Sequence, residues 1–189
     1  MNAGAILLAG GRATRMGGID KPRVEVRGRA LLQWAVDAVS GCEPIVIAGP
    51  ESSVSGAAPV WVREDPPFAG PAAAIVAALD LMDAEWTYVL ACDLPFAGDA
   101  VAVLAASIDL FPADTDGVCL ADASGRPQWL TGLYRTAALR GAASLLPDRG
   151  RDASVRALLD DLAIAVVAAP AAARDIDTWE DVRQIEEDE

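Results

Sequence analysis

The chain has 189 residues, of which 53% are apolar, and its formal net charge is −13. This length is typical of one domain with a substantial buried core, so we expect a single domain over residues 1–189. The excess of 28 Asp and Glu over 15 Lys and Arg argues against binding to nucleic acid or anionic membranes, which need positive charge on the protein. Because the chain contains no histidine, a histidine base, a Ser-His triad and a histidine-ligated metal are excluded.

The cysteines and the longest apolar run indicate the compartment. Cys42, Cys92 and Cys119 are widely spaced and odd in number, which is typical of neither a disulfide framework nor a zinc site. We expect them to be buried apolar residues in a reducing compartment. The apolar run at 162–173 is too short to span a bilayer, and no charged segment of a secretory signal precedes the first apolar run. These features predict a cytoplasmic protein.

Short apolar runs alternate with segments of helical spacing along the chain. The run at 4–8 predicts a buried strand, and the spacing at 31–39 predicts a helix. Further strands are predicted at 44–48, 60–62, 86–91, 118–121, 129–134 and 164–167, and further helices at 71–82, 99–108, 136–146, 154–161 and 178–187. We expect Asp99 to cap its helix, and Asp177 or Thr178 to cap the last one. Strands that are apolar throughout and alternate with helices predict a doubly wound, mostly parallel α/β sheet of Rossmann-like type.

The loop after the first strand concentrates the positive charge of the chain. Six of the 15 basic residues lie between positions 12 and 29, and Lys21 is the only lysine. Ligands of open α/β sheets bind beyond the carboxyl ends of the strands, where the adjacent glycines Gly10 and Gly11 let backbone N–H groups approach an anion. The loop is neither a Walker A loop nor a G-x-G-x-x-G loop. With Arg15 and Lys21 it predicts a phosphate-binding site, the alternative being glycines that only form turns.

A single carboxylate, Asp93, follows the strand predicted at 86–91 and faces the same crevice as the first loop. Mg²⁺ prefers one or two carboxylates together with phosphate oxygens and water, so Asp93 is a candidate Mg²⁺ ligand. The alternative is a turn or helix-capping aspartate before Pro95. Cys92 has no base nearby in the sequence and is expected to pack in the core.

The first loop carries a family resemblance. Leucine, alanine and two glycines, followed at fixed spacing by an arginine and a lysine, resemble the signature loop of the small nucleotidyltransferases, and the Gly-Gly form resembles bacterial molybdenum cofactor guanylyltransferases. The resemblance covers nearly the whole chain and implies the nucleotidyltransferase fold. It implies that Arg15 contacts the phosphates of GTP and that Lys21 contacts the phosphates and the transition state. The residues that it assigns to nucleotide binding are Leu8, Ala9, Gly10 and Gly11.

Three other segments match motifs of the same family. Cys-Asp-x-Pro at 92–95 resembles the metal-binding motif, and Asp65, ahead of a Gly-Pro turn, matches an aspartate that contacts the guanosine. Without the resemblance, Asp65 would be an ordinary loop carboxylate. Residues 175–180 read Asp-Ile-Asp-Thr-Trp-Glu, where guanylyltransferases have Asn-x-Asn-Thr-Pro-Glu. The aspartates look more like those of cytidylyltransferases, so Asp177 is a second candidate Mg²⁺ ligand, and Asp175 and Asp177 stay open between metal and acceptor.

The resemblance implies transfer of GMP from GTP to molybdopterin. A phosphate oxygen attacks the α-phosphorus, so no base is needed, while Mg²⁺, Lys21, Arg15 and Asp93 serve catalysis by positioning and charge neutralisation. Gly10-Gly11 favours GTP, because cytidylyl relatives usually have Ala-Gly there. Two alternatives remain: a cytidylyl or sugar- or alcohol-phosphate nucleotidyltransferase of the same fold, and a non-catalytic nucleotide-binding domain. The resemblance is also compatible with transient contact with other molybdenum cofactor biosynthesis proteins.

Overall fold

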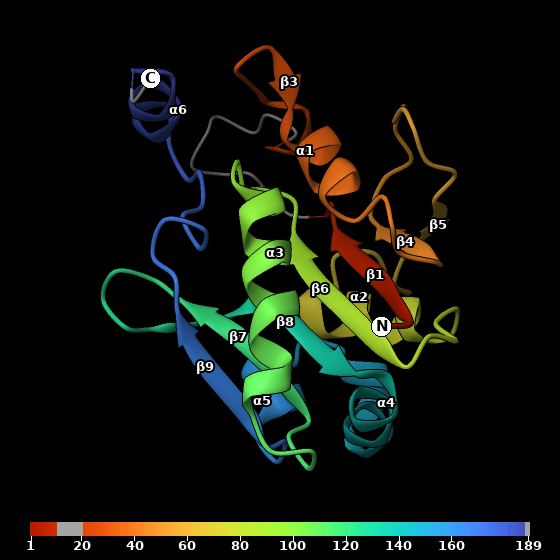
Figure 1. The fold of residues 1–189 in the computed structure, drawn as a ribbon. Helices are drawn as coiled ribbons and strands as arrows, with labels where there is room; N and C mark the ends of the chain where they lie inside the picture. Colours follow the sequence, from red (N-terminus) through yellow and green to blue (C-terminus); the bar gives the residue numbers. More distant parts are fainter. Residues whose placement is uncertain (11–20, 188–189) are drawn as a thin grey trace.

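The computed structural model describes residues 1–10 and 21–187 (Figure 1). Seven strands of the described residues form one mixed sheet in the order β5-β4-β1-β6-β8-β7-β9. The strands β5, β4, β1 and β6 run parallel to one another. The next strand, β8, is antiparallel to both of its neighbours, β6 and β7. The edge strand β9 is parallel to β7. The strands are β1 (Ala3–Leu8), β4 (Ile45–Ala48), β5 (Val60–Val62), β6 (Trp86–Ala91), β7 (Gly117–Ala121), β8 (Pro127–Arg135) and β9 (Ile164–Ala168). The predicted doubly wound, mostly parallel α/β sheet is confirmed, with β8 as its antiparallel member.

Helices cover both faces of the sheet (Figure 1). On one face, α1 (Leu31–Ala38) and α3 (Ala97–Ser107) pack on side chains such as Leu7 and Leu90. On the other face, α2 (Pro71–Leu79), α4 (Thr136–Leu145) and α5 (Val155–Leu159) pack on side chains such as Ile6 and Val89. Successive side chains of a strand point to opposite faces, so β1 supplies both core layers and is apolar at every position.

Some predicted helix boundaries are wrong. The helix α2 ends at Leu79 rather than at residue 82, and α3 begins at Ala97. The cap position of α3 is therefore Phe96, and Asp99 lies in the first turn instead of capping the helix. A carboxylate there still interacts favourably with the N-terminal end of the helix dipole.

A small hairpin that the sequence pattern did not predict follows the 3₁₀ turn η2 (Lys21–Arg23). Its strands β2 (Glu25–Val26) and β3 (Arg29–Ala30) are joined by two residues with positive φ, 53° at Arg27 and 70° at Gly28. Two such residues in succession are typical of the type I′ turns of tight hairpins. Strands of two residues are too short to carry a periodic pattern, so the sequence does not predict this hairpin.

The hairpin packs against the last helix, α6 (Trp179–Glu187). The guanidinium group of Arg27 also donates a hydrogen bond of 3.0 Å to the carbonyl of Ile185. These contacts bring the end of the first loop next to the C-terminal part of the chain. The apolar side chains buried between the two are Val24, Val26, Leu31, Ile176, Val182 and Ile185.

The three cysteines are free thiols. Cys92 and Cys119 are buried, as expected, whereas Cys42 is only partly buried. Burial raises the pKa of Cys42 to about 11. In the described part of the chain, no helix combines the length and the apolar composition needed to cross a membrane.

Candidate active site

The carboxyl ends of three parallel strands form the floor of the candidate site. Leu8, at the end of β1, pairs with Ala91 of β6 and with Ala48 of β4. The pairing continues past the strands, because the Cys92 N–H donates to the Leu8 carbonyl at 3.2 Å and the Ala9 N–H donates to the Ala48 carbonyl at 2.9 Å. Leu8 and Ala9 are buried, so the first exposed residue after β1 is Gly10, above this edge.

Asp93 stands directly beyond the end of β6, and a distant segment is fixed beside it. The Ile176 N–H donates a hydrogen bond of 3.0 Å to the Asp93 carbonyl, and the Ile176 side chain is fully buried against the hairpin and α6. This backbone contact places Asp175 and Asp177 on either side of the anchor.

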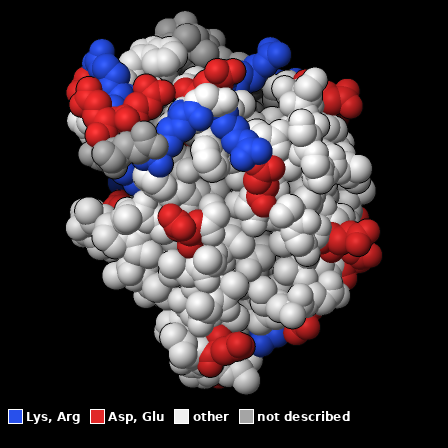
Figure 2. All heavy atoms as spheres, turned by 45° about the horizontal axis from the view of Figure 1, so that its top comes forward, with Lys and Arg blue, Asp and Glu red and all other residues white. Residues whose placement is uncertain are grey.

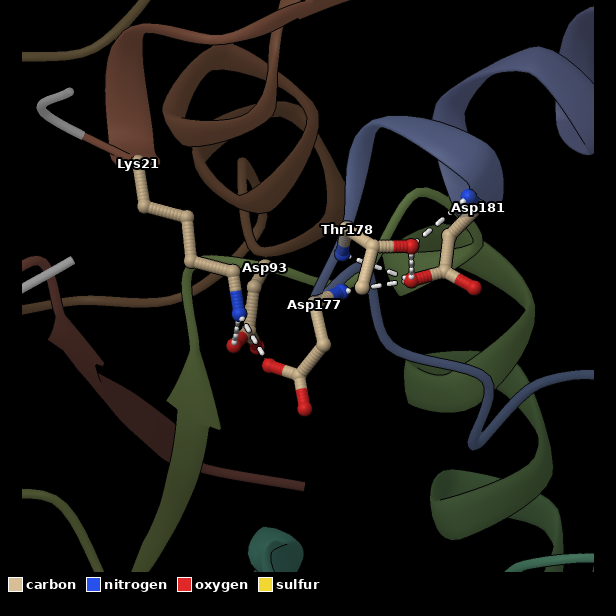
Figure 3. Close-up of polar contacts among 5 residues, drawn as sticks. All are labelled: Lys21, Asp93, Asp177, Thr178 and Asp181. Carbon is tan, nitrogen blue, oxygen red and sulfur yellow. Dashed lines mark hydrogen bonds and ion pairs between the residues drawn. The ribbon is translucent and has the colours of Figure 1, made fainter. Parts of the chain in front are cut away.

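Lys21 joins the two segments through its ammonium group. Its Nζ lies 2.8 Å from Oδ2 of Asp93 and 2.8 Å from Oδ1 of Asp177, and Figure 3 shows the group between the two carboxylates. The Lys21 and Asp93 side chains are only 20% and 23% exposed, whereas that of Asp177 is 44% exposed. The only lysine of the chain thus contacts two of the predicted site carboxylates, which come from positions 72 and 156 residues further along.

The charges around Lys21 keep it protonated. Burial alone would lower the pKa of the ammonium group, but the negative charges of Asp93 and Asp177 and their hydrogen bonds outweigh burial. The pKa of Lys21 is therefore raised above its ordinary value of 10.5. At neutral pH the Lys21 side chain is therefore positively charged, as a contact to phosphate requires.

Asp93, Asp175 and Asp177 together offer oxygen ligands for a metal ion. One carboxylate oxygen from each can be chosen so that all three lie within 4.8 Å of one another. Burial, followed by the negative charges of Asp93 and Asp177, raises the pKa of Asp175. A divalent cation would relieve this repulsion, and a donor set made only of oxygen atoms fits Mg²⁺.

Asp181 closes the cluster on the side of α6. Its Oδ2 accepts hydrogen bonds from the backbone N–H groups of Asp177 and Thr178 and from the Thr178 hydroxyl, at 3.0, 2.7 and 2.8 Å (Figure 3). In return, the Thr178 Oγ1 accepts from the Asp181 N–H at 3.2 Å. The predicted cap at Thr178 is confirmed, and the pair forms a capping box. Burial would raise the pKa of Asp181, but the hydrogen bonds, with that from the Thr178 hydroxyl foremost, lower it.

The surface charge is uneven around this edge of the molecule. Figure 2 turns the upper side of Figure 1, where the carboxyl ends of β1 and β6 lie, toward the viewer. Lys and Arg side chains gather there next to Asp and Glu, whereas the lower part of the face is mostly uncharged. The net charge of −13 thus coexists with positive groups near the strand ends.

The comparisons with known proteins agree with this arrangement. Residues 5–166 match the family described as the MobA-like NTP transferase domain. The chain belongs to this family. The resemblance expected from the first loop is therefore confirmed, and the chain is a nucleotidyltransferase.

Individual relatives of this MobA-like NTP transferase extend over most of its length. A probable molybdenum cofactor guanylyltransferase of Synechococcus elongatus is 34% identical over 162 residues, which are 80% of this chain and 81% of that protein. A molybdenum cofactor guanylyltransferase of Methylibium petroleiphilum is 33% identical over 162 residues, 77% of each chain.

Solved structures share the fold. Molybdopterin-guanine dinucleotide biosynthesis protein A of Archaeoglobus fulgidus has a TM-score of 0.73 at 20% identity, with 97% of each chain covered. The 2-C-methyl-D-erythritol 4-phosphate cytidylyltransferase of Thermus thermophilus has a TM-score of 0.69 at 20% identity, with 96% of each chain covered. At these identities the two structures support the nucleotidyltransferase fold alone.

The structure brings only some of the predicted site residues of this NTP transferase together. Asp93 and Asp177 meet on Lys21, while Gly11 and Arg15 lie outside the described residues. Asp65 is exposed on the loop after β5, which is the third strand from β6 in the sheet order. The structure does not test the roles predicted for these residues.

The sequence does not predict the full set of residues in the cluster. It leaves Asp175 open between metal and acceptor, and the structure places it near Asp93, beside the backbone contact of Ile176. Asp181 received no role, although the Thr-x-x-Asp spacing from Thr178 is the signal of a capping box. Cys92 is buried, and burial raises the pKa of its thiol, the opposite of what a nucleophilic cysteine needs.

The backbone just after β4 lies so close to the backbone just after β1 that a methyl group added at Gly49 would disturb it. A Cβ atom on Gly49 would lie 2.8 Å from the carbonyl carbon of Ala9 and 3.0 Å from the Gly10 nitrogen. We expect Gly49→Ala to displace this backbone, to destabilise the fold by about 1–3 kcal/mol and to raise KM for the nucleoside triphosphate about tenfold. Thermal unfolding and steady-state kinetics measure the two effects.

Gly41→Ala is the matched control for Gly49→Ala, since beyond its chain neighbours no described atom lies within 4 Å of its added Cβ. If Gly49→Ala has the stability and KM of the wild-type protein, the backbone at the end of β1 tolerates the added methyl group, and the prediction is wrong.

Proposed function

We propose that the chain transfers GMP from GTP to the phosphate group of molybdopterin, releases pyrophosphate and requires Mg²⁺. The observation that carries this proposal is the contact of Lys21 with Asp93 and Asp177 beyond the carboxyl ends of the parallel strands. Guanylyltransferases of molybdenum cofactor among the relatives support GTP and molybdopterin as the substrates.

The order of the strands supports a nucleotide that lies across their ends. Four consecutive strands, β5, β4, β1 and β6, carry Asp65 at one end of the row and Asp93 at the other. Neighbouring strands lie about 4.8 Å apart, so these two strand ends are separated by about 14 Å. An extended nucleoside triphosphate reaches across this row, with the guanosine near Asp65, the backbone of Leu8, Ala9 and Gly10 between, and the phosphates near Lys21.

The chemistry of the transfer needs no protein base. An oxygen of the acceptor phosphate forms a bond to the α-phosphorus of GTP, the bond from that phosphorus to the β-phosphate bridging oxygen breaks, and pyrophosphate leaves with its electron pair. The attacking oxygen is already anionic, which agrees with a chain without histidine. Catalysis then depends on positioning the reactants and on neutralising the negative charge that gathers between them.

Lys21 supplies a positive charge for this purpose, and three carboxylates supply metal ligands. The ammonium group exchanges its contacts with Asp93 and Asp177 for phosphate oxygens of the substrate. Asp93, Asp175 and Asp177 would hold Mg²⁺, which when bound polarises phosphate oxygens and offsets their charge. Asp93 and Asp177 therefore serve first as partners that orient Lys21 and then as ligands.

Release of pyrophosphate tests the proposal directly. We expect the purified protein to release pyrophosphate from GTP in the presence of molybdopterin and Mg²⁺, and to do so slowly or not at all from ATP, CTP and UTP. Removal of divalent metal with EDTA should stop the reaction, and added Mg²⁺ should restore it. The product with GTP is a dinucleotide that mass spectrometry identifies.

Other outcomes would favour the alternative functions. Faster release from CTP than from GTP would make the chain a cytidylyltransferase, in agreement with the two aspartates at 175 and 177. Binding of GTP without turnover, with molybdopterin and sugar and alcohol phosphates all supplied, would indicate a non-catalytic nucleotide-binding domain. Transient contact with other proteins of molybdenum cofactor biosynthesis stays a prediction from the resemblance.

A further inference from the structure

Asp177 lies in a segment that is neither helix nor strand, so its position depends on local tethers. Its side chain is 44% exposed, and core packing alone does not fix it. One tether lies on its N-terminal side, where the Ile176 N–H donates to the Asp93 carbonyl at 3.0 Å. The contact with Lys21 holds the Asp177 carboxylate, and a second backbone tether, on the C-terminal side, would fix residue 177 relative to the start of α6.

Asp181 supplies the second tether. An ordinary capping box satisfies the N–H of the cap residue, which here is Thr178. The same oxygen of Asp181 also accepts the N–H of Asp177, at 3.0 Å, so the carboxylate holds the backbone of the candidate ligand as well as the cap. In Figure 3, Asp181 and Lys21 lie on opposite sides of Asp177. Asp181 therefore acts on the site through the backbone of Asp177.

We propose that Asp181 is a positioning residue, which holds the Asp177 carboxylate beside Lys21 and Asp93 through the backbone of residues 177–178. The inference rests on the proposed function, since that function gives Asp177 its role as a metal ligand. Loss of the Asp181 carboxylate removes two backbone hydrogen bonds and one hydroxyl hydrogen bond at the point where the chain turns into α6. A displacement of about 1 Å in a catalytic group costs up to about 100-fold in rate, so loosening this segment has a measurable effect.

Asp181→Ala tests the proposal through metal binding as well as activity. We expect the variant, with GTP bound and no acceptor, to bind Mn²⁺ about tenfold more weakly than the wild-type protein in an electron paramagnetic resonance titration. The Mg²⁺ concentration for half-maximal activity should rise by about the same factor, while kcat at saturating Mg²⁺ falls less. Asp181→Asn, which keeps an acceptor oxygen, should shift both values in the same direction by less. Asp181→Glu, the longer carboxylate common in capping boxes, should restore most of the affinity.

Ser154→Ala separates positioning from simple helix capping. Ser154 caps α5, where its Oγ accepts from the Ala157 N–H at 3.1 Å, far along the chain from the cluster. We expect this control to lower the melting temperature, as loss of a helix cap does, and to leave Mn²⁺ affinity unchanged. If Asp181→Ala also lowers only the melting temperature, Asp181 is a helix cap and the proposal is overturned.

A parallel Mn²⁺ titration of Asp93→Asn distinguishes a failure of the positioning role of Asp181 from a failure of the proposed function. Weakened Mn²⁺ binding in Asp93→Asn together with wild-type binding in Asp181→Ala would overturn the positioning role alone. Unchanged Mn²⁺ binding in both variants would overturn the proposed metal site and, with it, the role of Asp181.

Discussion

Asp93→Asn is expected to lower the turnover of GTP at least about 100-fold, on the scale of losing one preorganised charge contact in an active site. The asparagine side chain is nearly isosteric with aspartate, so the end of β6 keeps its shape. What the variant loses is the negative charge that contacts Lys21 at 2.8 Å and that lies within 4.8 Å of Asp175 and Asp177. Both the orientation of Lys21 and the proposed Mg²⁺ site depend on this charge.

Asp99→Asn is the matched control for Asp93→Asn, because it removes an exposed aspartate carboxylate six residues later, in the first turn of α3. We expect it to cost only about 0.3–1 kcal/mol of stability, through the helix dipole, and to leave turnover unchanged. Pyrophosphate release measured at saturating GTP and Mg²⁺ compares the two. A rate for Asp93→Asn within a few-fold of wild type would contradict the assignment of Asp93.

The part of the site that the sequence predicts follows from the rules of parallel sheets. The strands at 4–8 and 86–91 are apolar throughout, which predicts that both are buried, and in an open α/β sheet the ligand site lies beyond their carboxyl ends. Leu8 and Asp93 are therefore expected at the same edge of the sheet, and the structure has β1 and β6 paired in parallel with Leu8 beside Ala91.

The antiparallel strand β8 could also have been predicted. The turn between β7 and β8 is short and carries Ser124, Gly125 and Arg126, and short connections join antiparallel strands, whereas parallel strands need a crossover. In the structure Asp122 organises this turn, since its Oδ1 accepts from the Ser124 and Arg126 N–H groups at 2.8 and 3.0 Å. The hydrogen bonds, with that from the Ser124 hydroxyl foremost, lower the pKa of Asp122.

The approach of Asp177 to Lys21 has no local sequence signal. It depends on the packing of α6 against a hairpin whose strands have two residues each, and on one backbone hydrogen bond between Ile176 and Asp93. Periodicity describes neighbours along the chain, and these partners are more than 150 residues apart. Only a family motif pointed to Asp177, and the structure supplies the contact that the motif could not.

Lys21→Met is expected to have two effects of opposite sign, because its ammonium group contacts two carboxylates that are also the candidate metal ligands. Turnover should fall at least about 100-fold, since a neutral side chain cannot offset the charge of the phosphates. Binding of Mn²⁺ to the nucleotide-free protein should become stronger, because the ammonium group no longer competes with the metal for Asp93 and Asp177. Charge-assisted hydrogen bonds of this kind contribute about 1.5–3 kcal/mol, so a gain of about tenfold in Mn²⁺ affinity is expected.

Arg23→Met is the control that separates contact from charge in this comparison. Arg23 is exposed at the other end of the same 3₁₀ turn, and its loss changes the net charge of the protein by the same amount as Lys21→Met. A small gain in Mn²⁺ affinity that both variants share reports the loss of one positive charge from the protein. Only the additional gain in Lys21→Met over Arg23→Met reports the competition between the ammonium group and the metal for the carboxylates. Weaker Mn²⁺ binding in Lys21→Met than in Arg23→Met would mean that the lysine supports the arrangement of the ligands rather than competing with the metal for them.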